Sequence, residues 1–409
     1  MSISDWLNII VIVVTIIGIA VGRFPVFRMN RATIALVGSA ILLLLQAITP
    51  EEAYNSIDMN TIVLLFSMMI INANLRLSGF FKLLVNHIIA FSKTPVQLLI
   101  FICFSSGILS GLFLNDTIVI IYTPLVLEVV LTLKRNPLPY LIALVTSANV
   151  GSAATIVGNP QNMIIGVYSK ISFTQFLFYL APAAVGGLFI IILVIMLIYR
   201  HEFRRETFLP VLPEEYRIFK PLMYKSLIVT ALMLASFLAG APVAMASLIA
   251  AAVLLFTRRI KPERVFTEID WSLLVFFCGL FIVTDVLGRY IVGSEFYIIA
   301  DDYSIKSIVN FSVISIVLSN LISNVPAVLA LSPMIKTMAN PEIYWILLAL
   351  TSPFAGNLTL LGSVANLITA ELAKKRGVII RFGEYLKAGI PITLLTVIYG
   401  VYLIYIFFV

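Results

Sequence analysis

Long apolar runs follow one another along almost the whole chain, separated by short polar intervals. Runs of about 20 residues match the roughly 30 Å hydrocarbon thickness of a bilayer, so the pattern predicts membrane helices in two successive sets. The first set covers 6–22, 32–48, 59–75, 95–113, 117–131, 138–169 and 175–199, with an amphipathic stretch at 79–92. The second set covers 221–239, 243–257, 271–288, 307–322, 326–336, 342–372 and 384–408.

One of these runs, around residues 146–166, is unsuited to a helix that faces lipid. Pro160 has no N–H to donate, and Gly158 costs about 1 kcal/mol relative to alanine in a helix. Because non-helical backbone at membrane depth is tolerated only inside protein or beside a watery cavity, we expect a break from Gly151 to Gly158. A new helix should begin near Pro160, since proline is favoured at the first position. For one run alone, a proline-kinked structural helix is an equal alternative.

A second run of the same kind, at residues 350–370, indicates an internal duplication. At an offset of 204, Thr155 matches Thr359, Gly158 matches Gly362 and Asn162 matches Asn366. At offsets of 209 to 212, Asn115 matches Asn324, Pro124 matches Pro333, Phe173 matches Phe382, Pro182 matches Pro391 and Ile57 matches Ile269. Because the matched segments keep the same order, we predict a first repeat at 1–199, a cytoplasmic linker at 200–220 and a second repeat at 221–409.

The placement of basic residues predicts the topology. The segments around Asn115 and Asn324 either span the membrane or fold back as re-entrant hairpins. Consider an arrangement in which each repeat has five spanning helices, one of them broken, and one hairpin, with both chain termini outside. In this arrangement, 23 of the 27 Lys and Arg residues lie on the cytoplasmic side. The four outside are Lys170, Arg289, Lys306 and Lys336. This positive-inside bias predicts an all-α multi-pass protein of the plasma (inner) membrane, with two inverted repeats.

The composition agrees with a membrane protein and excludes several other classes. Charged residues make up 11% of the chain, against about 25% in soluble domains. The net charge of +7 follows from the topology and gives little support to nucleic-acid binding. The chain has two histidines, and its two cysteines, Cys103 and Cys278, lie at positions that do not correspond between the repeats. A metal site or catalytic cluster built from these residues is therefore not expected. The first run, Trp6–Val21, lacks a basic n-region and a cleavage site, so we expect a retained helix.

Inverted repeats with helices broken near the midplane are typical of secondary transporters. Helix starts should converge after Asp116, at Pro160, at Pro326 and near Ser363. Their free N–H groups and positive dipole ends favour an anion, whereas the carbonyls that end the preceding half-helices can hold a cation.

Asp116 is the most informative single residue, because an acid at a hairpin tip inside the membrane is a functional candidate. We expect it to bind a coupling Na⁺ or carry a coupling proton; the matching position in the second repeat is the neutral Val325. The alternative is that Asp116 caps a helix starting at Thr117. Asp285 lies four residues before Arg289, so an interfacial ion pair and a gate are the two alternatives there.

The segment from Gly151 to Asn162, GSAATIVGNPQN, resembles the G-G-x-x-T-x-I-G-x-P-x-N segment of the ion transporter superfamily. That group includes arsenite pump membrane proteins, citrate permeases, divalent-anion/sodium symporters and the melanosomal P protein. Asn115-Asp116 with the later Thr123-Pro124 is similar to the N-D-x-x-x-x-x-x-T-P of arsenite-pump-like members, and Asn324-Val325-Pro326 is similar to their N-x-P. The resemblance covers essentially the whole chain.

The hairpin tips depart from the Ser-Asn-Thr of the divalent-anion symporters, since they read Leu114-Asn115-Asp116-Thr117 and Ser323-Asn324-Val325-Pro326. This favours the arsenite-pump-like branch over sodium-coupled carboxylate or sulfate symport. The resemblance also implies an elevator-type movement of the hairpins and broken helices against a scaffold of the remaining helices. It leaves open a homodimer and, on the arsenite-pump-like branch, an ATPase partner.

Two transport hypotheses follow, and an enzyme is a distant third. The first is a secondary active transporter of a small anion or oxyanion, with arsenite or antimonite efflux favoured, coupled to H⁺ or Na⁺. The second is a Na⁺/H⁺ antiporter in which Asp116 itself exchanges ions. An enzyme is not expected, because Glu51-Glu52 and Asp301-Asp302 resemble solvated loop charge. The candidate substrate and ion site comprises Asn115, Asp116, Thr117, Thr155, Gly158, Asn159, Asn162, Ser323, Asn324, Thr359, Gly362, Ser363 and Asn366, with a candidate Na⁺ site near Asn115, Asp116 and Asn324. No cofactor is expected beyond the coupling ion.

Overall fold

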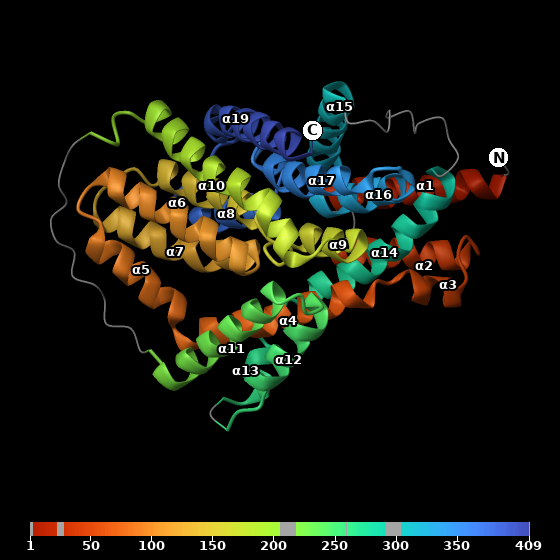
Figure 1. Cartoon of the computed structure of the whole chain (residues 1–409), viewed down its shortest axis with the longest axis horizontal. Helices are drawn as coiled ribbons and strands as arrows, with labels where there is room; N and C mark the ends of the chain where they lie inside the picture. Colours follow the sequence, from red (N-terminus) through yellow and green to blue (C-terminus); the bar gives the residue numbers. More distant parts are fainter. Residues whose placement is uncertain (1–2, 23–27, 205–217, 259, 292–303, 409) are drawn as a thin grey trace.

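The computed structural model describes residues 3–22, 28–204, 218–258, 260–291 and 304–408, and the regular elements in these ranges are α-helices without β-strands (Figure 1). Nine of the described helices are long and apolar enough to cross a membrane. The first half contains α1 (Ile3–Val21), α2 (Arg31–Leu44), α3 (Pro50–Ser56), α4 (Met59–Ser78), α5 (Phe80–Phe91), α6 (Pro95–Leu112), α7 (Asn115–Thr132), α8 (Pro137–Ser152), α9 (Pro160–Ser169) and α10 (Phe173–Ile198). The second half contains α11 (Lys220–Leu238), α12 (Val243–Leu255), α13 (Pro262–Phe266), α14 (Trp271–Ile291), α15 (Ile305–Ile322), α16 (Asn324–Thr337), α17 (Pro341–Ala355), α18 (Val364–Lys375) and α19 (Phe382–Phe408). The pair Asp301-Asp302 and most of the expected linker lie outside the described residues.

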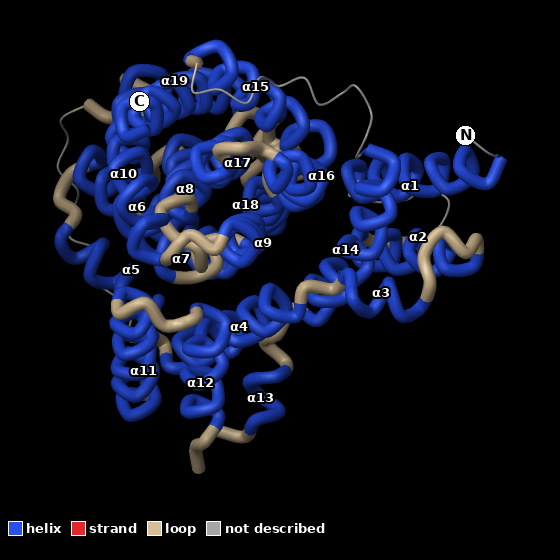
Figure 2. The backbone as a smooth tube through the Cα atoms, turned by 45° about the vertical axis from the view of Figure 1, so that its right-hand side comes forward, coloured by secondary structure: helices blue, strands red, loops and turns tan. Residues whose placement is uncertain are grey.

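The helices form two groups, and both halves of the chain contribute to each (Figure 2). We call α6–α10 together with α15–α19 the central bundle; in it α6 packs on α8, α15 on α17, and α10 on α19. We call α1–α4 together with α11–α14 the frame. The frame is built crosswise, because α2 of the first half packs on α14 of the second, and α12 of the second half packs on α4 of the first.

The two expected helix breaks are confirmed. Helix α8 ends at Ser152 and α9 begins at Pro160, while α17 ends at Ala355 and α18 begins at Val364. Local capping explains where the second halves start. The Asn159 side chain accepts a hydrogen bond from the Asn162 N–H at 2.8 Å, and the Ser363 hydroxyl accepts one from the Ala365 N–H at 3.2 Å. A short polar side chain before a helix satisfies N–H groups that have no partner within the helix.

The helices after both hairpin tips begin earlier than the sequence predicts. Helix α7 begins at Asn115, because the Asn115 N–H donates to the Gly158 carbonyl at 3.0 Å and does not need an intrahelical partner. The N-cap is Leu114, so the alternative in which Asp116 caps the helix is wrong. Helix α16 begins at Asn324, with Pro326 inside the first turn, where its missing N–H costs little.

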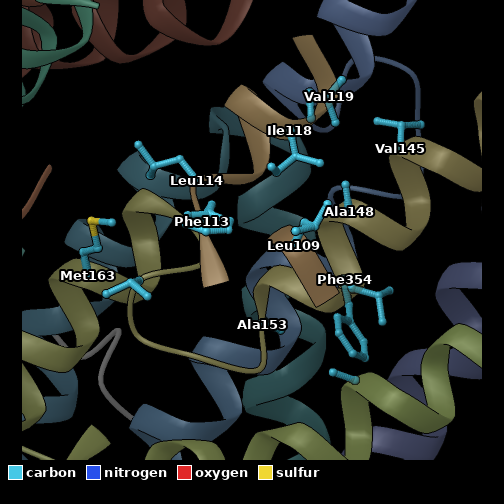
Figure 3. Close-up of a cluster of buried hydrophobic side chains, with 14 of the residues drawn as sticks. Leu109, Phe113, Leu114, Ile118, Val119, Val145, Ala148, Ala153, Met163 and Phe354 are labelled. Carbon is cyan, nitrogen blue, oxygen red and sulfur yellow. The ribbon is translucent and has the colours of Figure 1, made fainter. Parts of the chain in front are cut away.

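Apolar side chains hold the first hairpin tip against the breaks (Figure 3). Leu109, Phe113 and Leu114 near the tip are buried, and so are Met163 of α9 and Phe354 of α17. Close backbone contact adds to this packing. A Cβ added at Gly151 of α8 would overlap the backbone of Gly107 in α6, so α6 and α8 approach as closely as small residues permit in membrane helices.

The frame carries an ion pair between Asp285 and Arg289 near the C-terminal end of α14. Arg289 Nη2 lies 3.0 Å from Asp285 Oδ2 and 3.5 Å from Glu52 Oε1 of α3. All three side chains are substantially exposed. Asp285 therefore joins α14 to α3 at the surface and lies away from the helix breaks.

Candidate substrate and ion site

A cavity of about 1010 Å³ lies between the central bundle and the frame. It is bounded on the bundle side by the two hairpin tips and the helix breaks, and on the frame side by the starts of α2 and α14. Its polar and charged lining includes Asn30, Arg31, Asn115, Asp116, Gln161, Asp270, Ser272, Ser323, Asn324, Ser363, Glu371, Lys374 and Lys375. Five of the sequence-predicted site residues, Asn115, Asp116, Ser323, Asn324 and Ser363, therefore face one space.

The first break is tied to the first hairpin by backbone and hydroxyl groups. The Thr155 hydroxyl donates to the Gly111 carbonyl at the end of α6. The Asn159 amide donates to the Ser152 hydroxyl at 2.9 Å. The Asn162 amide donates to the Ala153 carbonyl at 3.3 Å. A Cβ at Gly158 would overlap the Ser152 carbonyl, so only glycine fits where the chain folds back. These predicted residues hold the break in shape behind the cavity wall.

The second break is held in the same manner. The Asn366 amide donates to the carbonyls of Gly356 at 2.7 Å and Thr359 at 2.9 Å. Asn320 of α15 donates to the Ala355 carbonyl at 2.9 Å and so joins the second hairpin to this break. A Cβ at Gly362 would lie 2.8 Å from Asn320 Oδ1, which leaves no room for a larger residue.

One buried asparagine, Asn149 of α8, connects the two halves. Its Oδ1 accepts hydrogen bonds from the Asn115 amide at the first tip and from the Ser363 hydroxyl at the second break, each at 3.2 Å. Its Nδ2 donates to Asn357 Oδ1 at 2.8 Å and Asn366 Oδ1 at 3.1 Å. Asn149 is 1% exposed, so these bonds form away from bulk water. We call these five residues the asparagine network.

The sequence analysis missed Asn149, Asn357, Gln161, Arg31 and Asp270. Asn357 lies within the second break and Gln161 at the start of α9, so the same local polar signal that selected their neighbours applies to them. Asn149 lies inside the regular part of α8 and carries no local signal. Arg31 and Asp270 belong to the frame, and only the tertiary packing brings them to the cavity.

The second tip stores backbone strain. Ser323 joins α15 to α16 with φ +77° and ψ 156°, a region that is essentially restricted to glycine and costs about 1–3 kcal/mol. The first tip differs, because Leu114 there has an ordinary extended conformation. Such strain persists where the surrounding structure holds it, commonly at ligand clamps.

Two amide oxygens in this region have no hydrogen-bond partner among the described residues, Asn162 Oδ1 and Asn324 Oδ1. A buried acceptor left unpaired costs about 1–3 kcal/mol. Within the described ranges no three His, Cys, Asp or Glu side chains come together as a metal site. A cation bound between the tips would therefore depend on amide and carbonyl oxygens, with Asp116 as the nearby acid.

Asp116 lies half-buried in the first turn of α7, where it faces the cavity. Arg31 and Asp270 of the frame are close enough to act on it electrostatically. Its own N–H donates to Asn115 Oδ1 at 2.9 Å. The adjacent Thr117 faces another way, since its hydroxyl lies 3.5 Å from the Asn72 amide of α4, and it is absent from the cavity lining.

Many apolar membrane helices around a polar cavity, with two helix breaks beside two helical hairpins, define a multi-pass membrane transporter. The chain belongs to the citrate transporter family, whose model matches residues 9–355. The resemblance to the ion transporter superfamily is thereby confirmed.

Individual relatives are transporters by name, and a solved transporter structure has the same fold. The silicon efflux transporter LSI3 of Oryza sativa subsp. japonica is 30% identical, over 93% of this chain and 93% of its own length. A Dictyostelium discoideum relative named arsB is 25% identical, over 98% of this chain and 92% of its own. The Alcanivorax borkumensis YdaH transporter, at 12% identity, matches the fold over 99% of this chain and 97% of its own with a TM-score of 0.59.

Proposed function

We propose that this protein is a secondary active transporter of a small anion or oxyanion, with efflux of an arsenite- or antimonite-type oxyanion as the favoured activity. The asparagine network is the observation that carries the proposal. It joins the first tip to the second break directly behind a cavity large enough for a small solute. The names of two relatives, a silicon efflux transporter and arsB, support a hydroxylated inorganic substrate.

The chemistry of the cavity wall suits such a substrate. Helices α7, α9, α16 and α18 all begin at or beside the cavity, and helix starts present N–H groups and positive dipole ends to an anion. Amide groups of Asn115, Gln161 and Asn324 add donors and acceptors. Oxyanions and their hydroxylated acids use both kinds of partner.

Coupling to H⁺ or Na⁺ is assigned to Asp116, helped by the unpaired oxygens of Asn162 and Asn324. The central bundle would move against the frame in an elevator-type step, carrying both tips together. The crosswise packing of α2 on α14 and α4 on α12 supports a continuous frame for that movement. We assign the two inverted repeats to residues 1–199 and 221–409, with the linker at 200–220 on the cytoplasmic side of the plasma membrane.

A Na⁺/H⁺ antiporter is the second candidate, and one observation favours it. Asp116 faces the cavity as a carboxylate that does not cap a helix, so it is free to exchange one cation for another. In that case no anion would be needed for ion movement.

The test is transport by purified protein in liposomes, with arsenite, antimonite, sulfate and citrate offered under H⁺ or Na⁺ gradients. Gradient-driven movement of arsenite or antimonite supports the proposal. Preference for sulfate or citrate with Na⁺ supports symport in its place, and Na⁺-dependent proton movement without any anion supports the antiporter.

The matched variant is Asp116→Asn. It keeps the size of the side chain and one acceptor oxygen but removes the charge, so coupled transport should fall below about 1% of the wild-type rate while the protein still folds. Asp285→Asn, which changes an acid far from the cavity at the α14–α3 ion pair, should keep the wild-type rate. Unchanged rate and pH dependence in Asp116→Asn would remove Asp116 from the mechanism.

A further inference from the structure

Arg31 brings a positive charge from the frame to the cavity. It is the first residue of α2, it is half-buried, and it lines the cavity opposite the first hairpin tip. The residue after α1 makes room for the side chain: Gly22 has φ +80°, and a Cβ added there would lie 3.3 Å from Arg31 Nε and 3.6 Å from Nη2. The guanidinium therefore lies against the backbone at the end of α1.

No carboxylate of the described residues forms a salt bridge with this guanidinium. Asp116 attracts it electrostatically without lying at ion-pair distance. Asp270 has another partner, because its Oδ1 caps α14 by accepting the Leu273 N–H at 3.0 Å. An arginine held without a carboxylate partner keeps its planar set of five N–H donors available, and this geometry suits the oxygens of an oxyanion or carboxylate.

The other basic residues of the cavity lining are differently placed. Lys374 and Lys375 lie exposed at the end of α18, in the central bundle. Lys375 Nζ is 3.9 Å from Glu371 Oε1 on the same helix. Among the basic residues of the cavity lining, Arg31 thus differs from the two lysines in two ways: it belongs to the frame, and it is partly buried.

We propose that Arg31 is the anion-recruiting residue of this transporter: it binds the substrate in the cavity before the hairpin tips and helix breaks receive it. The inference rests on the proposed anion transport. It assigns the first binding step to the frame and the later binding steps to the cavity wall formed by the hairpin tips and helix breaks. A residue with this role sets apparent affinity from the cavity side more than it sets the maximal rate, because the anion leaves Arg31 before the bundle completes its movement.

The experiment compares wild type, Arg31→Gln, Arg31→Lys and Arg28→Gln in liposomes, with arsenite, sulfate and citrate as probes. Arg28→Gln is the matched control, since Arg28 is exposed just before the start of α2 and does not line the cavity. For each probe that the wild type transports, Arg31→Gln should raise KM about tenfold and change the maximal rate less than about twofold. Arg31→Lys keeps the charge but not the planar fork, so KM should rise about threefold. Arg28→Gln should keep the wild-type KM.

The outcomes separate this inference from the proposed function. Anion transport with the same KM in wild type and Arg31→Gln overturns the inference and leaves the proposed function standing. An equal rise in KM for Arg28→Gln overturns it too, because general surface charge would then explain the effect. If Arg31→Gln does not fold, Arg31→Lys decides, and a wild-type KM in that variant counts against Arg31. A wild type that moves none of the anions overturns both proposals.

Discussion

Asn149 illustrates how much one buried amide can organise. Its side chain makes four hydrogen bonds, with one group from α7, one from α18 and two from the second break. Inside a low-dielectric interior each of these bonds is strong, and each partner is costly to leave unpaired. Asn149 therefore holds the first tip and the second break at a set separation.

We predict that Asn149→Ala lowers the free energy of unfolding by at least about 2 kcal/mol, because several buried polar groups lose their partner at once. Transport should fall as well, since the first tip and the second break are no longer joined. Thermal unfolding in detergent and liposome flux measure the two effects. Asn55→Ala, at an exposed asparagine of α3, is the control and should change neither. An Asn149→Ala protein as stable as wild type would mean that the network adds little.

At the scale of the elements, the packing of α6 on α8 explains how the hairpin is held rigid. Gly107 and Gly151 bring the two backbones into direct contact, and the Thr155 hydroxyl bonds to the Gly111 carbonyl one turn further along α6. The hairpin and the break therefore behave as one unit. Helices α10 and α19, the last helices of the two halves, pack on each other and on α8 and α17, so they are part of the central bundle.

We predict that Gly151→Ala lowers the free energy of unfolding by about 1–3 kcal/mol, because the added methyl group forces α6 and α8 apart. The same substitution at Gly383 of α19, where a Cβ would meet nothing within 4 Å, should stabilise the protein by up to about 1 kcal/mol, because alanine is the better helix former. Unfolding midpoints of the two variants should thus move in opposite directions. A shift of the same sign and size in both would show that helix propensity, and not the α6–α8 contact, controls the result.

At the scale of the whole molecule, the cavity is lined in part by the starts of α2 and α14 and the end of α18. The positive-inside bias assigns these ends to the cytoplasmic side. With that predicted topology, the cavity would lie toward the cytoplasm, the side from which the proposed efflux would load its substrate.

We predict that a cysteine at Ser272, which is exposed in the cavity lining, reacts with a membrane-impermeant maleimide from the cytoplasmic side. A cysteine at Ala239, exposed at the end of α11, should react only from the opposite side. Both variants are made after Cys103 and Cys278, the two native free cysteines, are replaced by alanine. Labelling is measured in right-side-out and inverted vesicles, and reaction of both positions from one side would contradict the predicted inverted repeats.

The chain by itself determined the helices and where two of them break. Apolar run length, Pro160, Gly158 and the capping residues Asn159 and Ser363 act within a few positions of themselves, so their effects can be read locally. The starts of α7 and α16 lie two residues before the predicted ones, and at α7 the bond from the Asn115 N–H to the Gly158 carbonyl joins two segments that are distant in the chain.

The composition of the cavity wall was decided only by the tertiary structure. Asn149 and Asn357 are 208 positions apart in the chain, and Arg31 reaches the same cavity from another helix group. Nothing in the periodicity around these residues distinguishes a side chain that meets a distant partner from one that meets lipid or solvent. Which polar groups share one space depends on how the helices of both halves pack, and that is a property of the folded molecule.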